Sequence, residues 1–309
     1  MDNVRALKLV FFMMIGLTIV AVIAVWSSQS LAIAEDVLFE DVAITCYENR
    51  LINVENDQES DILPTIYFVT PTYPRREQVP ELTRLGQTLK QVKSLHWIVA
   101  DDNTECNPSL VRLLKKFGIP LTVMASPMPK VFWKREKGQM PRGVANRRAA
   151  LSWIRNNARN GVLYFGDDDN TFDLDLFEEI RYTKKVSMMP VGLIGDFGVS
   201  SPVVKEGKVI GFFDSWPGNR KFPIDMAGFA VSIKFLNESP AATMPFKVGY
   251  EEDMFLQNLG LKVEDIEPVA DHCKKVIYFH IYWSSTSLTN PHILFRYSFG
   301  TPKPLTNRE

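Results

Sequence analysis

Strand and helix patterns alternate along the chain from residue 64 to residue 172. Short apolar runs rich in β-branched and aromatic residues, at 65–70, 95–100, 121–124 and 162–165, are typical of strands buried on both faces. Segments with apolar residues at helical spacing separate these runs. The alternation predicts an α/β fold with a mostly parallel, doubly wound central sheet, a layout that many nucleotide-binding proteins share.

The helices of this pattern are predicted from Val79, from the Asn107-Pro108 cap and over 144–157. After residue 188 the regular alternation stops. The elements expected there are, in order, a hairpin over 202–213, a strand-like segment over 225–236, a short helix over 250–259 and a last strand over 277–283.

Three consecutive carboxylates follow the strand at 162–165. Asp167, Asp168 and Asp169 would repel one another and are costly to desolvate unless a cation or hydrogen-bond donors face them. Ligands collect at the carboxyl ends of such strands, and carboxylates without nearby His or Cys favour Mg²⁺ or Mn²⁺ over zinc. The run therefore predicts an ion that bridges the protein to a diphosphate. A solvated acidic turn, with Asp167 or Asn170 capping the next helix, is the competing interpretation.

An uncharged apolar run over residues 9–26 is about long enough to span a bilayer. Arg5 and Lys8 precede it and acidic residues follow it, so the positive-inside rule predicts a cytosolic N-terminus. We therefore expect one transmembrane helix in a type II topology. A cleaved signal peptide is the alternative, because small residues follow the run.

This anchor would divide the chain into four parts. They are a cytoplasmic tail (1–8), the membrane segment (9–26), an acidic stem (27–63) and a lumenal domain (64–309).

Cysteine content and net charge argue against disulfide scaffolds, cysteine metal sites and nucleic-acid binding proteins. Cys46, Cys106 and Cys273 show no metal-ligand spacing and are too few for a disulfide scaffold. One disulfide in an oxidising lumen would leave a third thiol, and Cys46 in the stem is the candidate for an intermolecular bond. The net charge of -1 gives no basis for binding nucleic acid. Asn237 begins an Asn-Glu-Ser glycosylation sequon, which would be lumenal.

Several separated stretches together resemble one family. They are Thr70-Pro71-Thr72-Tyr73, Pro141-Arg142-Gly143 with Arg147, residues 164–171, residues 224–231, Gly249-Tyr250-Glu251-Glu252, and His280. In order and residue type they are similar to the animal β-1,3-glucuronosyltransferases, glycosyltransferase family 43. The resemblance implies a GT-A type nucleotide-diphospho-sugar transferase fold, with UDP bound by residues up to about 195 and the acceptor by later ones.

The resemblance implies a nucleoside site at the end of the first strand. Tyr73, after Pro71 and Thr72, would stack on uracil, and Asp102 would bond the ring edge. Asp168 would bind the ribose. For Tyr73 alone, a loop aromatic packed on the core would be the simpler interpretation.

It also implies residues for the rest of the donor. Arg142 and Arg147 would bind the diphosphate or the glucuronate carboxylate, because guanidinium pairs bidentately with either. Asp169 would be the Mn²⁺ ligand, with Asp167 in support. His280 would donate a hydrogen bond to the phosphate or the sugar; a satisfied core histidine is the alternative.

The stretch at 249–252 resembles the family's catalytic segment. Inverting transfer requires a carboxylate that takes the proton from the attacking hydroxyl, and the resemblance implies Glu252 for this role. From spacing alone, Glu251 and Asp253 are equally suitable. Asp225 and Arg220 resemble acceptor-binding residues, and Trp216 offers a face on which a sugar can pack.

Two positions depart from the family's pattern. Tyr282 stands where an arginine is expected two residues after His280, and Ser200 stands where an acidic acceptor contact is expected. The leading hypothesis is a Golgi membrane enzyme, a homodimer, that uses Mn²⁺ to transfer glucuronate from UDP-glucuronate to a terminal galactose of a proteoglycan linker or of an N-acetyllactosamine glycan. The alternatives are a different UDP-sugar donor, such as UDP-xylose, and a non-catalytic sugar-binding relative.

Overall fold

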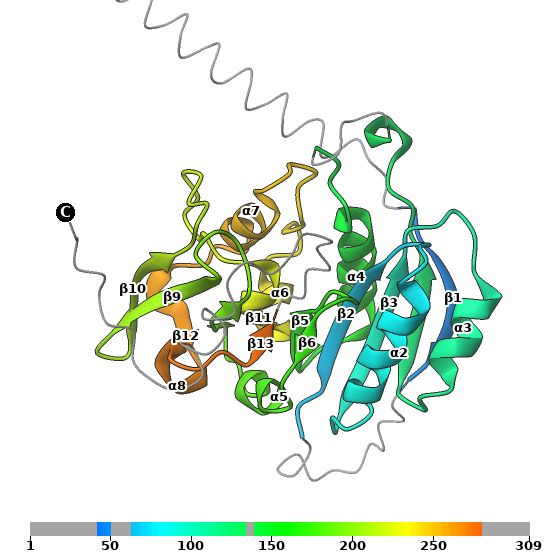
Figure 1. Ribbon diagram of the computed structural model, residues 1–309, viewed down its shortest axis with the longest axis horizontal. Helices are drawn as coiled ribbons and strands as arrows, with labels where there is room; N and C mark the ends of the chain where they lie inside the picture. The colour runs from blue at the N-terminus through cyan, green and yellow to red at the C-terminus, as the bar shows by residue number, and fades with distance from the viewer. Residues whose placement is uncertain (1–41, 51–62, 134–138, 280–309) are drawn as a thin grey trace, which may run out of the picture. The chain divides into compact units, whose positions relative to one another are not determined.

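The computed structural model describes residues 42–50, 63–133 and 139–279 (Figure 1). Among these residues, no helix is long and apolar enough to cross a membrane. The apolar run at 9–26 lies outside them, so the anchor stays a prediction.

The first half of the domain is built from alternating strands and helices, as the sequence pattern predicts. Its strands β4, β3, β2 and β5 lie side by side in this order and are all parallel. The order reverses between β2 and β5, and α2 covers the front of the sheet while α4 lies behind it (Figure 1). Ligands of such sheets bind at this reversal, outside the carboxyl ends of the strands. The elements are β2 (Ile66–Thr72), α2 (Gln78–Leu89), β3 (Leu95–Asp101), α3 (Pro108–Lys115), β4 (Leu121–Ala125), α4 (Val144–Asn157) and β5 (Val162–Phe165).

Local sequence explains where these helices begin. The side chain of Asn107 accepts hydrogen bonds from the backbone N–H groups of Ser109 (3.0 Å) and Leu110 (3.2 Å) at the start of α3. Pro108 fits the first turn because its missing N–H would have no helical partner there. The cap predicted from the Asn-Pro pair is confirmed.

The second half makes the sheet mixed rather than mostly parallel. Strand β11 (Phe229–Ser232) runs antiparallel to both β5 and β7 (Val186–Met188), and β12 (Ile266–Pro268) is parallel to β7. The full order is β1-β4-β3-β2-β5-β11-β7-β12. The prediction of a mostly parallel sheet therefore holds for β2 to β5 and for the pair β7–β12, and it is wrong for the antiparallel strand β11.

A strand from the predicted stem completes the other edge of the sheet. β1 (Ile44–Asn49) pairs antiparallel with β4, and a disulfide joins Cys46 to Cys106 at the start of α3. Part of the predicted stem therefore belongs to the folded domain, and the proposal of an intermolecular bond at Cys46 is wrong. Cys273 is the free thiol among the described residues.

The remaining strands form a second, smaller sheet. It contains β6 (Thr171–Phe172), β8 (Val191–Gly192), β9 (Val199–Lys205), β10 (Lys208–Phe213) and β13 (Tyr278–Phe279), in the order β10-β9-β8-β13-β6. The predicted hairpin is β9–β10, and both of its turn residues, Glu206 and Gly207, have positive φ angles of 52° and 75°. Residues 280–283 of the last predicted strand lie outside the described residues.

One predicted strand is largely helical. The segment 225–236 forms a 3-10 turn (Met226–Gly228), β11, and then the helix α6 (Ile233–Glu238). Ser232 pairs with Val162, the first residue of β5, so the strand ends where its partner begins. The remaining elements are α5 (Asp175–Ile180), α7 (Glu251–Asn258), α8 (Ala270–Cys273) and the 3-10 turns Lys130–Phe132 and Val263–Asp265.

Candidate active site

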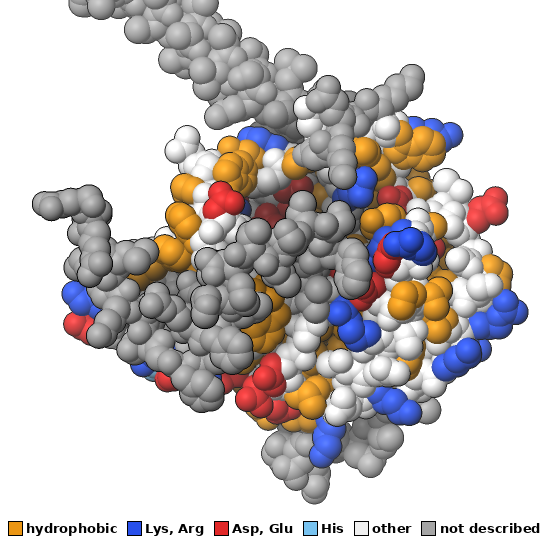
Figure 2. Space-filling model, in the orientation of Figure 1, with side chains coloured by type: hydrophobic (Ala, Val, Ile, Leu, Met, Phe, Trp, Pro, Cys, Tyr) orange, Lys and Arg blue, Asp and Glu red, His pale blue; other side chains and the backbone are white. Residues whose placement is uncertain are grey.

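The three carboxylates after β5 lie at the reversal of strand order, and two of them face arginines. Arg147 of α4 donates to Asp167 at 2.5 Å. Arg75, after β2, donates to both oxygens of Asp168 at 2.8 and 2.7 Å. The cations that the carboxylate run requires are therefore supplied in part by the protein itself, and Figure 2 shows acidic and basic side chains together where β2 and α2 meet.

The Pro-Arg-Gly stretch before α4 brings Arg147 to this position. Gly143 caps α4 with a φ of 73°, a conformation that favours glycine. A Cβ on Gly143 would lie 2.5 Å from Nη1 of Arg147. A side chain at this position would therefore crowd the Arg147 guanidinium that pairs with Asp167.

Nine predicted donor residues line one pocket, which we call the donor pocket. Tyr73 is 41% exposed there, and the Arg142 guanidinium lies 5.6 Å from the centroid of its ring. Asp102 accepts a hydrogen bond from the Met128 N–H at 2.7 Å, and burial raises the pKa of Asp102. The nine are Pro71, Thr72, Tyr73, Asp102, Arg142, Arg147, Asp167, Asp168 and Asp169.

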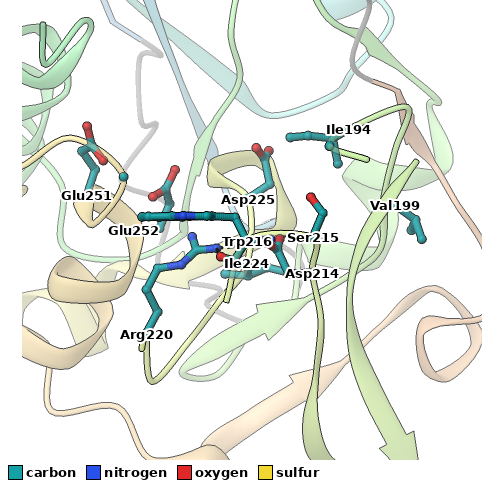
Figure 3. Close-up of a pocket in the computed structure, with 12 residues that line it drawn as sticks. Ile194, Val199, Asp214, Ser215, Trp216, Arg220, Ile224, Asp225, Glu251 and Glu252 are labelled. Carbon is teal, nitrogen blue, oxygen red and sulfur yellow. Dashed lines mark hydrogen bonds and ion pairs between the residues drawn. The ribbon is translucent and has the colours of Figure 1, made fainter. Parts of the chain in front are cut away.

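Four further predicted residues line a second pocket, which we call the acceptor pocket. They are Trp216, Arg220, Asp225 and Glu252. Arg220 lies over the Trp216 indole, 4.6 Å from the ring centroid, and in this view the carboxylates of Glu252 and Asp225 lie on the other side of the ring (Figure 3).

Asp214 is a member of the acceptor pocket that the sequence analysis missed. Its Oδ1 accepts hydrogen bonds from the Trp216 N–H (2.8 Å) and from Arg220 (3.0 Å), and its Oδ2 accepts one from the Ser200 hydroxyl (2.6 Å). The Arg220 and Asp214 side chains are only 6% and 11% exposed. This buried ion pair fixes the loop that presents the indole, and a lone Asp in a loop carries no sequence signal for it.

The structure separates the three carboxylates of α7. Asp253 is buried and accepts hydrogen bonds from the Phe222 N–H (2.8 Å) and the Gln257 amide (2.7 Å), which is a structural role. Glu251 and Glu252 both line the acceptor pocket, but the Glu251 side chain points away from Trp216 in Figure 3. Glu252 is therefore the best-placed carboxylate for proton transfer.

The environment of Glu252 suits a base that works near neutral pH. Burial is the largest influence, and together with the charges of Asp225 and Glu251 it raises the pKa of Glu252 to about 8. The charge of Arg147 lowers it. Arg147 lines the donor pocket, so a charge of that pocket acts on Glu252 in the acceptor pocket.

The acidic run offers a metal ion only part of a ligand set. No group of three or more His, Cys, Asp or Glu side chains in the described ranges could hold an ion by itself. Asp169 lines the donor pocket, and ions such as Mg²⁺ are commonly held by one or two carboxylates plus substrate phosphates. The arrangement fits an ion shared with a diphosphate rather than one held by the protein alone.

Two predicted sites lie outside or away from these pockets. His280 and Tyr282 are outside the described residues. Asn237 lies in α6, where its amide donates to the Ala158 carbonyl at 3.4 Å. Its glycosylation stays a prediction.

The chain is similar to known glycosyltransferases. The profile of glycosyltransferase family 43 matches residues 85–284. A Drosophila melanogaster relative, galactosylgalactosylxylosylprotein 3-beta-glucuronosyltransferase S, is 55% identical over 245 residues, which are 78% of this chain and 59% of that protein. The human galactosylgalactosylxylosylprotein 3-beta-glucuronosyltransferase 2 is 41% identical over 74% of this chain and 72% of its own length. A second Drosophila relative, enzyme P, is covered over only 45% of its length, so the chain spans about half of these two fly proteins.

Solved structures match parts of the chain at low sequence identity. S. aureus TarS (residues 1–349) matches with a TM-score of 0.44 and 16% identity, over 70% of this chain and 60% of that one. The mannosyltransferase PcManGT from Pyrobaculum calidifontis matches with a TM-score of 0.42 and 12% identity, over 71% and 57% of the two chains.

Proposed function

Because this chain belongs to glycosyltransferase family 43, we propose that it is an inverting β-1,3-glucuronosyltransferase with a GT-A type domain. It transfers glucuronate from UDP-glucuronate to a terminal galactose. The observation that carries the proposal is the position of Glu252, a carboxylate with a raised pKa in a pocket next to the arginine-lined donor pocket. The relatives named for the galactosyl-galactosyl-xylosyl protein favour that linker as the acceptor over an N-acetyllactosamine end.

The donor pocket would hold UDP by contacts of three kinds. The exposed face of Tyr73 offers a stacking surface for uracil, and Asp102 offers an acceptor for the base edge. Asp168 would bind the ribose. Arg142 and Arg147 would stabilise the anionic groups of the donor.

Chemistry would take place where the pockets meet. Glu252 accepts the proton of the acceptor hydroxyl as that oxygen bonds to the anomeric carbon of the glucuronate. The bond between that carbon and the UDP oxygen breaks at the same time, and UDP leaves with the electron pair. A single displacement inverts the anomeric centre and needs no protein nucleophile. Trp216, held by Arg220 and Asp214, would orient the acceptor sugar.

Asp169 would hold Mn²⁺, and His280 would assist at the phosphates or the sugar. When bound, the ion would stabilise negative charge on the departing UDP. The carboxylate oxygens of the donor pocket suit such an ion. Activity that survives complete chelation and is not increased by added Mn²⁺ would contradict this part of the proposal.

The cellular setting proposed is the Golgi membrane. The apolar run 9–26 would anchor the chain with its catalytic domain in the lumen, and the domain would form a homodimer. The Cys46–Cys106 disulfide supports an oxidising compartment. Protease protection of the domain in sealed Golgi vesicles tests the lumenal orientation. The mass of the purified protein by light scattering tests the homodimer.

The test of function is a transfer assay with the full-length chain. UDP-glucuronate and UDP-xylose are compared as donors, with a galactose-galactose-xyloside and a galactose-N-acetylglucosamine acceptor in parallel. We expect glucuronate transfer to the xyloside. If UDP-xylose reacted and UDP-glucuronate did not, the donor would be UDP-xylose. This donor is included because Tyr282 stands where the family pattern has an arginine. Binding of UDP without any transfer would favour a non-catalytic sugar-binding protein.

A further inference from the structure

Arg75 lines the donor pocket and forms an ion pair with Asp168, the side chain proposed to bind the ribose. Its Nη1 donates to Oδ2 of Asp168 at 2.8 Å, and its Nη2 donates to Oδ1 at 2.7 Å. The two side chains are 13% and 6% exposed. This is a bidentate pair shielded from water, a geometry that adds directional specificity to the charge interaction.

The same guanidinium also covers Tyr73. Its central carbon lies 4.7 Å from the centroid of the Tyr73 ring. Arg75 therefore contacts both Tyr73, which is proposed to stack on the base, and Asp168, which is proposed to bind the ribose. The Arg142 guanidinium also lies 5.6 Å from this ring centroid, so the uracil would stack on the ring surface that the two guanidinium groups leave open.

The Thr72 side chain of β2 also holds Asp168, and Gln78 of α2 supports Thr72. The Thr72 hydroxyl donates to Oδ2 of Asp168 at 2.6 Å, and the Gln78 amide donates to Thr72 at 3.1 Å and to Asp101 at 3.2 Å. Asp168 thus receives three hydrogen bonds from described residues. An ionised carboxylate accepts about four, which leaves capacity for a ribose hydroxyl.

We propose that Arg75 is a positioning residue for the nucleoside of the donor. It holds the Asp168 carboxylate and the Tyr73 ring in their binding arrangement before the nucleotide arrives, so that less ordering is required on binding. The inference rests on the proposed function, because it assumes that a uridine nucleotide binds in this pocket. Lysine cannot replace Arg75, because a single ammonium group cannot make the two parallel hydrogen bonds and cover the ring.

Calorimetric titration of the full-length chain with UDP and with UMP, in buffer containing Mn²⁺, tests the proposal. The variants are Arg75→Gln and Arg75→Lys. The matched control is Arg76→Gln, because Arg76 is the next residue, its side chain is 91% exposed and it pairs with Glu77 on the surface. We expect both Arg75 variants to lose at least tenfold in affinity, by similar factors for UDP and UMP, and the control to bind as the wild type does.

Kinetics and a double variant separate positioning from a general loss of structure. Arg75→Gln should raise the donor KM while the acceptor KM stays unchanged. In an Asp168→Asn background, Arg75→Gln should lower UDP affinity by a smaller factor than it does in the wild type, because the two residues act as a unit.

Three results would overturn the inference. One is UDP affinity in Arg75→Gln within twofold of wild type, and another is full rescue by Arg75→Lys. The third is a loss confined to UDP, which would place the guanidinium on the diphosphate instead. A wild-type chain that bound no UDP would overturn the proposed function itself, and this inference with it.

Discussion

The raised pKa of Glu252 predicts a steep pH dependence of transfer. The base works only when it is ionised, and burial with the charges of Asp225 and Glu251 raises its pKa to about 8. Roughly a tenth of the carboxyl groups are then ionised at pH 7 and roughly a hundredth at pH 6. We expect kcat/KM to rise about tenfold per pH unit below about 8 and to level off above it.

Removing one neighbouring charge should move this profile. Asp225→Asn removes the larger of the two carboxylate influences on Glu252, so its pKa should fall and the inflection should shift to lower pH. The Asp225 Oδ1 accepts the Ala227 N–H at 3.0 Å, a bond that the asparagine oxygen can also accept. The fold should therefore survive, although the level of activity will also reflect altered acceptor contacts.

The assay is initial-rate transfer of labelled glucuronate between pH 5.5 and 9.5 at acceptor concentrations well below KM, so that the rate reports kcat/KM. The pH of the inflection is compared between variants. Asp175→Asn is the control, because Asp175 is an exposed carboxylate in the first turn of α5. A wild-type profile flat from pH 6 to 9 would refute the assignment of Glu252 as a buried base. An inflection unmoved by Asp225→Asn would refute the stated cause of the raised pKa.

Three further changes test the supports of the site. Trp216→Ala should raise the acceptor KM about tenfold, or about 1.4 kcal/mol, with UDP affinity unchanged; a change in UDP affinity instead would contradict the acceptor role. Asp214→Ala leaves Arg220 buried without its partner and should lower the free energy of unfolding by about 3 kcal/mol in urea titration; an unchanged midpoint would show that the pair is unimportant. The double change of Cys46 and Cys106 to serine opens a loop with a sequence separation of 60 residues and should cost about 2–4 kcal/mol; equal stability of oxidised and reduced wild type would contradict this.

The parallel half of the fold is predictable because its information is local. Each strand from β2 to β5 is an apolar run, and each helix between them has its own periodicity or cap, as Asn107 shows for α3. The short chain connections then leave few arrangements for the sheet. Boundaries of α4 and β5 follow directly from the sequence.

The elements that the sequence did not predict depend on distant partners. β1 has an acidic, weakly periodic neighbourhood, and it is a strand only because β4 and the disulfide to Cys106 lie beside it. Residues 233–236 have strand-like composition, but the last backbone hydrogen bonds at this end of β11 run from Ser232 to Lys185 and from Ile233 to Gly161, and the chain then turns into α6.

The candidate site was likewise predictable from the sequence only in part. The acidic run and the Pro-Arg-Gly stretch are visible as motifs, whereas Arg75 and Arg76 look alike in sequence. Only the fold places the first against Asp168 and the second in solvent. In the same way, the hydrogen bonds of Asp253 are invisible in the sequence, and they leave Glu252 as the better-placed carboxylate.

The most direct test of the account is single-turnover transfer from UDP-glucuronate by Glu252→Gln, with Glu251→Gln as the matched control. The amide keeps the shape of the side chain and removes the base, and burying a neutral group in place of a carboxylate should not destabilise the fold. We predict that Glu252→Gln lowers the rate by about 10²–10⁴-fold, binds UDP as the wild type does, and differs from a Glu251→Gln variant that remains active. Transfer by Glu252→Gln at the wild-type rate, or a loss of rate found only in Glu251→Gln, would contradict the role of Glu252 as the base.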